Sequence, residues 1–468
     1  MSRKTELIFV LFIDTIACMG AVFLYYHARF EWGLVDRPVQ RPPDLVAPTI
    51  VFTLFWLLLF TFAGLYRSRF AASRFDEIIS VFKVVSFGIL VLFFVIFIDQ
   101  FDARSGRLPI MVYWFSMVGL VILGRMIVRT VQKILLLRGY GTHNTLLVGR
   151  DSLLVEFTEE LGKYPQAGFK LVGEIRVGAQ GEAVLQLKEP LQGHMADPIA
   201  ALPEIIARLK VQDVVLALSS QDHTVLNNVL RICDRQPVTL KLVPDFYSVI
   251  GGMARTEHMY GLPLIEVYPE PMAAWEESTK RLIDFFVSLV GLVVLIPFLI
   301  LIGIVIKLTS HGPAIYRQKR VGQHGREFTM LKFRTMRADA EAKTGPVWAS
   351  AFDERYTPIG RWLRKLRLDE LPQLWNVLMG QMSLVGPRPE RPFFVEKLAQ
   401  EIPLYGRRHR VKPGITGLAQ VKWKYDETVE DVRQKVKYDL FYIENMSLKQ
   451  DISILFQTIR TAILGKGQ

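Results

Sequence analysis

The sequence predicts a membrane protein with three parts: an N-terminal four-helix transmembrane bundle, a Rossmann-like α/β domain, and an α-rich domain that contains a proline-kinked membrane helix. Three observations lead to this fold class. Half of the 468 residues are hydrophobic and only 22% are charged, which is typical of a chain in contact with lipid. Long apolar runs open the chain, and another run with a proline at its centre follows much later. Between them, short β-branched segments alternate with amphipathic ones.

The beginning of the chain, residues 1–140, is predicted to form the transmembrane bundle. Each of its apolar runs is long enough to cross a bilayer, which takes about 20 residues. Arg3 and Lys4 precede the first run as in a signal peptide, but no Ala-x-Ala-like cleavage site follows, so we expect this run to be retained. Lysine and arginine are modestly enriched on the side of the membrane that carries the N-terminus, which indicates that this side is the cytoplasm. An even number of crossings then puts the chain after residue 140 in the cytoplasm as well. The runs cover residues 7–26, 45–66, 78–98 and about 110–128.

Two charged residues, Asp14 and Lys83, lie within these apolar runs. A charge inside a membrane helix is a candidate for function. A contact between helices, or a side chain that reaches to the headgroups, explains such residues more simply, and we favour that explanation here.

The composition limits the kinds of site available. A net charge of +12 fits a surface that faces anionic lipid, phosphorylated small molecules or nucleic acid, and does not choose among them. The two cysteines, Cys18 and Cys233, are far apart in the sequence and exclude a disulfide framework or a Cys-rich zinc site.

Residues 141–250 are predicted to form a small parallel α/β domain. The strand-like segments NTLLVG, FKLVGEI, VQDVVLALS and VTLKLVPD alternate with helical patterns. A dinucleotide fingerprint needs three spaced glycines after the first strand, and only Gly149 is present. A structural or regulatory role is therefore favoured over nucleotide binding. Residues 251–278 are rich in Gly, Pro and Met without sustained periodicity, which indicates a linker.

A fifth apolar run, residues 285–306, carries Pro297 at its middle, and we predict a bend there within a helix over 282–308. If this helix crossed the bilayer, everything after it would lie outside the cell. A helix that enters one leaflet and returns would keep both soluble regions in the cytoplasm. An ordinary fifth crossing with a tolerated kink is the alternative. The flanking cations Lys280, Arg281 and Lys307 would hold both ends of the returning helix at one headgroup layer.

The stretch LRLDELPQLWNVLMG places two adjacent carboxylates, Asp369 and Glu370, just before Pro372, which suits the first turn of a short helix. The helix dipole and the nearby cations Arg364, Lys365 and Arg367 would then favour the ionised carboxylates. Such a pair is able to bind Mg²⁺ together with phosphate oxygens and to attack an electrophilic phosphorus. The alternative for an isolated pair is helix capping and pairing with neighbouring arginines.

Three basic clusters follow the fifth apolar run, at residues 316–343, 361–367 and 407–412. Clusters of this kind suit phosphate-rich ligands and an anionic membrane face. Nucleic acid is the rival ligand, but the chain contains no recognisable DNA- or RNA-binding module, so we do not expect it as a partner.

Several motifs occur together, in order, within residues 279–468. In this region the sequence resembles the bacterial sugar transferases of the monotopic phosphoglycosyl transferase class, which move a sugar-1-phosphate from a nucleoside diphosphate sugar to a polyprenyl phosphate. The preceding helices and α/β domain resemble the large subclass of that family in architecture. The motifs are KRLIDFFVSLVGLVVLIPF, RVGQHGREFTMLKFRTM, LRLDELPQLWNVLMGQMSLVGPRP, RVKPGITGLAQV and YDLFYIENMSLKQDI.

The resemblance implies a ping-pong reaction in which a UDP-sugar and undecaprenyl phosphate react in turn. By motif match, Asp369 would attack the sugar-bearing phosphorus, UMP would leave, and the lipid phosphate would attack the acyl phosphate. Glu370 would assist through Mg²⁺ or by handling a proton. The residues Lys332, Arg364 and Arg388 match positions that the family uses around phosphates, and Pro297 matches its membrane hinge.

The same resemblance implies a homodimer in the bacterial inner (cytoplasmic) membrane, with the catalytic domain on the cytoplasmic face, where it would initiate exopolysaccharide, capsule or O-antigen synthesis. No residue identifies the sugar. Two rivals are a polytopic transferase with single-step transfer and a non-catalytic membrane adaptor that binds nucleotide or lipid phosphates. A long soluble-looking stretch between the last apolar run and Asp369 counts against the first rival. The glycines Gly414 and Gly417 are more simply explained by a tight turn than by substrate contact.

Overall fold

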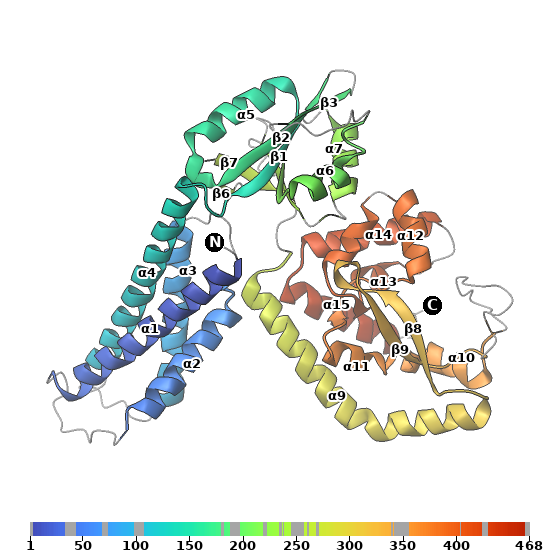
Figure 1. Ribbon diagram of the computed structural model, residues 1–468. Coiled ribbons are helices and arrows are strands. Elements are labelled where there is room, and N and C mark those ends of the chain that lie inside the picture. Colours follow the sequence, from blue (N-terminus) through green and yellow to red (C-terminus); the bar gives the residue numbers. More distant parts are fainter. Residues whose placement is uncertain are drawn as a thin grey trace. The chain divides into compact units, whose positions relative to one another are not determined.

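The computed structural model (Figure 1) forms two compact units, Met1–Pro269 and Glu270–Gln468. The structure describes residues 3–32, 44–67, 74–97, 107–178, 182–187, 197–218, 222–233, 236, 238–244, 257–259, 262–267, 271–337, 340, 355–402, 404–423 and 429–463.

The first four apolar runs form helices that pack side by side (Figure 1). Their contact surface contains both large and minimal side chains: the Trp56 indole donates to the Tyr113 hydroxyl over 2.7 Å, and Gly88 lies where an added Cβ would come within 2.4 Å of the Trp56 ring. The α2 helix has 17 residues and is about 26 Å long, close to the thickness of the hydrocarbon core of a bilayer. The helices are α1 (Arg3–Phe30), α2 (Val46–Phe62), α3 (Arg74–Leu92, continued by the π-helical turn η1, Phe93–Phe97) and α4 (Arg107–Leu137).

A buried ion-pair network connects three of these helices. The Asp14 carboxylate on α1 is fully buried and accepts hydrogen bonds from Arg125 Nη2 at 2.6 Å and Nε at 3.3 Å on α4. Arg125 Nη1 also donates to Glu77 on α3 at 3.3 Å, and Arg129 Nε donates to Glu77 at 2.5 Å. Asp14 thus has the helix-to-helix role that the sequence favours. Lys83 is exposed on the outside of the bundle.

The α/β domain contains a seven-stranded sheet in the order β3-β2-β1-β4-β5-β7-β6. The central strands β2, β1, β4 and β5 are parallel, as predicted, whereas β3, β7 and β6 pair antiparallel at the edges. The elements are β1 (His143–Gly149), α5 (Asp151–Lys163), η2 (Pro165–Ala167), β2 (Phe169–Val177), β3 (Ala183–Leu187), α6 (Leu202–Leu209), β4 (Asp213–Ala217), α7 (His223–Cys233), β5 (Thr239–Leu242), β6 (Glu257–Met259) and β7 (Leu262–Glu266).

Two of these strands lie in residues 251–278, where the sequence indicates a linker. The β6 and β7 strands extend the sheet, and the division between the two units follows residue 269. Strands of three and five residues are too short to give a sustained alternation of polar and apolar residues. Pro263 at the second position of β7 also argues against a strand in the sequence.

The second unit combines one very long helix with short strands and helices. The α9 helix (Ala274–Thr309) has 36 residues, is largely apolar, and has Pro297 in its interior. It is followed by the hairpin β8 (Ile315–Val321) and β9 (Glu327–Phe333), with η3 (Gln323–Gly325) at its turn. The remaining elements are α10 (Pro358–Lys365), η4 (Leu368–Glu370), α11 (Gln373–Leu378), β10 (Ser383–Val385), α12 (Pro392–Glu401), η5 (Tyr405–Arg410), β11 (Gly414–Thr416), α13 (Leu418–Lys422), α14 (Val429–Glu444) and α15 (Leu448–Ile463).

The α9 helix bends along its length (Figure 1), and Pro297 removes one backbone donor from its interior. Both ends are bonded to the same unit. Near the start, Lys280 Nζ donates to the Val385 carbonyl at 2.9 Å. At the other end, Arg334 donates to the carbonyls of His311 and Ser310 at 2.6 and 2.8 Å, where it satisfies acceptors at the helix C-terminus.

The bundle network yields a prediction about stability. Asp14→Leu should destabilise the bundle by about 3–5 kcal/mol because it leaves Arg125 as a buried charge without its main partner. The double variant Asp14→Leu/Arg125→Met should recover much of this loss, because apolar residues replace both charges and Arg129 still pairs with Glu77. Thermal inactivation of the purified protein measures both effects. A double variant that is less stable than Asp14→Leu would contradict the assignment.

Candidate active site

The two carboxylates Asp369 and Glu370 lie in η4, a single turn between α10 and α11. Arg367 begins this turn in the left-handed conformation, with φ of 59°, which for a residue other than glycine has a free-energy cost of about 1 kcal/mol. Pro372 directly precedes α11, one position outside the helix that the sequence predicts to begin there. Both carboxylates are buried, with 7% and 8% of each residue exposed.

Glu370 is held by two cations from different parts of the unit. Arg388 Nη2 donates to Glu370 Oε1 at 2.8 Å, and Lys332 Nζ lies 3.5 Å from the same oxygen. Burial opposes ionisation of this carboxyl, but Arg388 and Lys332 outweigh it and hold the pKa of Glu370 well below its ordinary value. Burial in turn lowers the pKa of Lys332 to about 8.

Asp369 is buried to the same extent as Glu370 but differs from it in its contacts and in the direction of its pKa shift. Within the described part of the chain, no side chain or backbone group forms a hydrogen bond or ion pair with its carboxylate. Burial, and then the charge of Glu370, raise the pKa of Asp369. The sequence predicts two carboxylates whose ionised form is favoured by surrounding cations. At Asp369 the cations Lys332, Arg364 and Arg388 do lower the pKa, but burial and the charge of Glu370 act in the opposite direction and outweigh them. A desolvated carboxylate with a raised pKa is more basic and therefore a stronger nucleophile once it is ionised.

The third predicted phosphate-binding residue, Arg364, lies on α10 and does not contact either carboxylate directly. Its guanidinium is stacked on the Tyr356 ring at 4.5 Å and donates to the Tyr356 hydroxyl. Its positive charge nevertheless acts to lower the pKa of Asp369. The structure thus brings Lys332 and Arg388 to the carboxylate pair and leaves Arg364 at the exposed side of the site.

Arg388 is presented by the segment 385–390, which we call the strap. Cationic side chains bond its backbone carbonyls: Lys280 bonds that of Val385 at 2.9 Å, and Arg320 bonds that of Pro389 at 2.9 Å. Arg320 is a further residue of the site that was not predicted from the sequence. Its only signal is membership of a basic cluster, because carbonyl partners leave no pattern in a sequence.

Three glycines let the strap approach β11 closely. An added Cβ on Gly414 would lie 2.1 Å from the Gly386 backbone nitrogen, and one on Gly417 would lie 2.3 Å from the Gly386 carbonyl oxygen. Neither Gly414 nor Gly417 has a positive φ. The tight-turn explanation is therefore wrong, and close contact between two backbones explains these glycines.

A metal ion at this site would depend on the carboxylate pair. Among the described residues, no group of three or more His, Cys, Asp or Glu side chains is arranged to hold a metal. A Mg²⁺ ion needs only one or two carboxylates when substrate phosphates and water complete its shell. The carboxylate of Asp369 fits that requirement, because it is a buried acceptor that forms no hydrogen bond or ion pair within the described residues.

The chain is similar to known proteins over most of its length. Residues 275–465 match the family model for bacterial sugar transferases. A UDP-glucose:undecaprenyl-phosphate glucose-1-phosphate transferase of Klebsiella pneumoniae is 30% identical over 426 residues, which cover 89% of each chain. The chain belongs to the bacterial sugar transferase family. Two further relatives are the enzyme of the same name from Xanthomonas campestris pv. campestris, 31% identical over 100% of this chain and 95% of its own, and a UDP-N-acetylgalactosamine-undecaprenyl-phosphate N-acetylgalactosaminephosphotransferase of Aeromonas hydrophila, 41% identical over 48% of this chain and 52% of its own.

Membership of this sugar transferase family establishes that the protein is an enzyme and removes the non-catalytic adaptor. Residues 61–244 also match a family model described as a CoA-binding domain. In a sheet of this kind a nucleotide binds beyond the carboxyl ends of the strands where the strand order reverses, here β1 and β4. Arg150 and the buried Asp222 occupy that position as a bidentate ion pair. These two charged groups at the carboxyl edge of the sheet therefore bind each other in this structure.

A histidine next to the strap predicts sensitivity to acid. Burial, together with Arg408, lowers the pKa of His409 to about 4, against an ordinary value of about 6.5. Because the unfolded chain takes up this proton first, stability should fall as the pH drops from about 6.5 towards 4, by about 2 kcal/mol at pH 5. His409→Asn should reduce the difference in melting temperature between pH 7.5 and pH 5, and the exposed control His324→Asn should leave it unchanged. An unchanged difference in His409→Asn would contradict this assignment.

Proposed function

We propose that this sugar transferase moves a sugar-1-phosphate from a UDP-sugar to undecaprenyl phosphate and releases UMP, through a phosphosugar carried by Asp369. The donor and acceptor classes are those in the names of its relatives, which include enzymes for glucose and for N-acetylgalactosamine. The product would begin a surface polysaccharide at the cytoplasmic face of the inner membrane.

One observation carries the covalent step: two adjacent carboxylates have opposite environments. Glu370 is fixed by Arg388 and Lys332 at 2.8 and 3.5 Å, which lower its pKa and make it the weaker nucleophile of the two. Asp369 is buried, has a raised pKa, and has no partner within the described residues. The same cations that hold Glu370 are available to phosphate oxygens, since guanidinium and ammonium groups pair with carboxylate and phosphate alike.

In the first step an oxygen of ionised Asp369 forms a bond to the sugar-bearing phosphorus of the donor. The bond from that phosphorus to the bridging oxygen breaks, and UMP leaves with the electron pair. In the second step an oxygen of the lipid phosphate attacks the acyl phosphate, and the carboxylate of Asp369 is regenerated. This order lets a soluble donor and a membrane-embedded acceptor use one site in turn.

We include Mg²⁺ in the proposal. Asp369 and Glu370 would hold it together with substrate phosphate oxygens and water. The ion would supply positive charge against the phosphate oxygens, while Arg388 and Lys332 orient the phosphates.

The proposal also includes the membrane arrangement of α9, a helix that is apolar and long enough to cross a bilayer. A straight helix of 36 residues would be about 54 Å long, well beyond the thickness of the hydrocarbon core. The bonds of Lys280 to Val385 and of Arg334 to Ser310 attach both ends to one soluble unit. A helix that enters one leaflet, bends at Pro297 and returns satisfies these attachments, and it keeps the carboxylate pair at the lipid boundary.

The covalent step predicts that the donor alone is enough for one round of UMP release. Wild-type protein mixed with UDP-glucose, UDP-galactose or UDP-N-acetylgalactosamine, with Mg²⁺ but no lipid, should release about one UMP per active site with its own donor. Continuous release should require undecaprenyl phosphate. Asp369→Asn should release none, whereas the exposed control Glu396→Gln should match wild type. Lipid-dependent release from Asp369→Asn at the wild-type rate would exclude Asp369 as the nucleophile.

The proposed membrane arrangement predicts on which side of the membrane two positions lie, one after α1 and one after α9. A single engineered cysteine at Trp32, exposed after α1, should react with a membrane-impermeant maleimide in intact cells. One at Lys397, exposed on α12, should react only after permeabilisation. The native Cys18 and Cys233 are both buried and give a low background. Labelling of Lys397→Cys in intact cells would mean that α9 crosses the bilayer.

A further inference from the structure

We propose that Arg408 is a positioning residue for the transfer reaction: it fixes the backbone of Arg388 so that the guanidinium of that residue reaches the carboxylate pair. This inference rests on the proposed function, because it concerns the phosphate site of that reaction. Arg408 lies in η5, within the basic cluster 407–412. From the sequence, this cluster is expected only to bind phosphate-rich ligands or an anionic membrane face.

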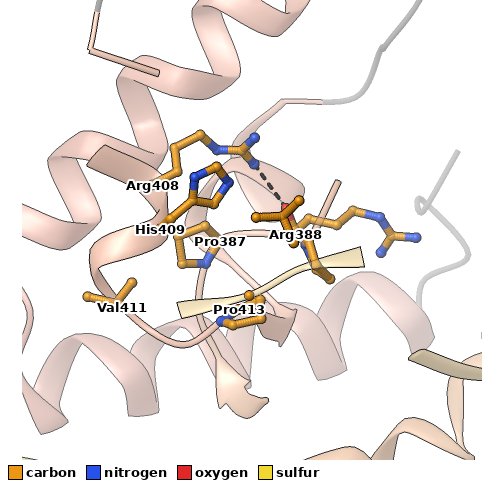
Figure 2. Close-up of a pocket in the computed structure, with 9 residues that line it drawn as sticks. Pro387, Arg388, Arg408, His409, Val411 and Pro413 are labelled. Carbon is orange, nitrogen blue, oxygen red and sulfur yellow. Dashed lines mark hydrogen bonds between the residues drawn. The ribbon is translucent and has the colours of Figure 1, made fainter. Parts of the chain in front are cut away.

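The contact is made to the main chain. Arg408 Nη2 donates to the carbonyl oxygen of Arg388 at 3.0 Å, and Figure 2 shows the Arg388 guanidinium directed away from Arg408 and His409. On its other side Arg388 Nη2 reaches Glu370 at 2.8 Å. Arg388 is therefore held at its backbone by the buried Arg408, while its side chain bonds Glu370.

The Arg408 guanidinium has little freedom to move. Its Nε donates to Asp439 Oδ2 on α14 at 2.8 Å, and its Nη1 donates to the Tyr405 hydroxyl at 2.7 Å. The side chains of Arg408 and Asp439 are only 7% and 3% exposed. With these contacts made, the group presents its remaining nitrogen to the strap in one orientation, as a planar guanidinium allows.

The composition of the strap explains why such a contact is needed. Arg388 stands between Pro387 and Pro389, neither of which has a backbone N–H to donate. The strap therefore forms its hydrogen bonds to the rest of the unit mainly through its backbone carbonyls. A buried ion pair such as Arg408–Asp439 adds little net stability, because desolvation offsets the attraction between the charges. The contacts of Arg408 do give Arg388 a defined position. Such positioning matters because a displacement of about 1 Å in a reacting site can lower the rate by about a hundredfold.

The test is the KM for the donor, since KM does not depend on the fraction of active protein. In the full-length enzyme, Arg408→Gln should raise the KM for the preferred UDP-sugar about tenfold, the loss expected when one hydrogen bond to a charged group is removed. The matched control is Arg407→Gln, one residue earlier in η5, which forms an ion pair with Glu444 at 3.6 Å. Its KM should stay within twofold of wild type.

Tyr405→Phe provides a milder variant in case Arg408→Gln does not fold, because it removes one hydrogen bond to Arg408 and keeps the Asp439 ion pair. It should raise the donor KM about twofold to fivefold, as expected for one neutral hydrogen bond. A folded Arg408→Gln, or failing that Tyr405→Phe, with lower specific activity but wild-type KM would overturn the proposal, because a purely structural role predicts that result.

A second readout does not require turnover. The affinity of the unreacted protein for UMP should weaken in Arg408→Gln by a factor similar to the change in KM. If wild-type protein binds UMP but releases none from any UDP-sugar, the proposed reaction fails while weaker UMP binding in Arg408→Gln still supports the positioning role. If wild-type protein does not bind UMP at all, the positioning role is overturned.

Discussion

The site depends on the pairing of Glu370 with Arg388 and Lys332. Two adjacent carboxylates in a buried turn repel each other, and the arrangement is tolerable only if one of them is neutralised by fixed cations. The structure assigns both cations to Glu370. Asp369 is buried and forms no ion pair within the described residues. The difference between the two neighbouring acids therefore depends on where β9 and the strap place Lys332 and Arg388.

The contacts of the strap explain why the guanidinium of Arg388 is not needed to hold the strap in place. Lys280 and Arg320 each pair with a carboxylate, Asp451 at 2.5 Å and Glu390 at 3.3 Å, and each also donates to a strap carbonyl. These contacts satisfy the backbone carbonyls of Val385, at the end of β10, and of Pro389, between β10 and α12. Arg388 has no need to bond its own segment, and its guanidinium stays available to the carboxylate pair and to phosphate.

Much of this was accessible from the sequence, and the exceptions have physical causes. The apolar runs, the proline in α9 and the central parallel strands follow from length, composition and periodicity. The short antiparallel strands β6 and β7 were missed because three to five residues give no reliable period. Asp369, Glu370, Lys332 and Arg388 were recognised through motifs, and the structure brings them together. The unequal environments of Asp369 and Glu370 were not predictable, because they depend on partners 18 and 38 residues away from Glu370. A homodimer stays a prediction of the resemblance, and no residue identifies the sugar.

All the described contacts of Glu370, and both attachments of α9, come from residues of the second unit, Glu270–Gln468. The chemistry is therefore encoded in one contiguous stretch of the gene. Over evolution, the N-terminal membrane helices and the α/β domain would be freer to diverge or to be exchanged by recombination, while selection on the transfer step acts most directly on the part of the gene that encodes Glu270–Gln468.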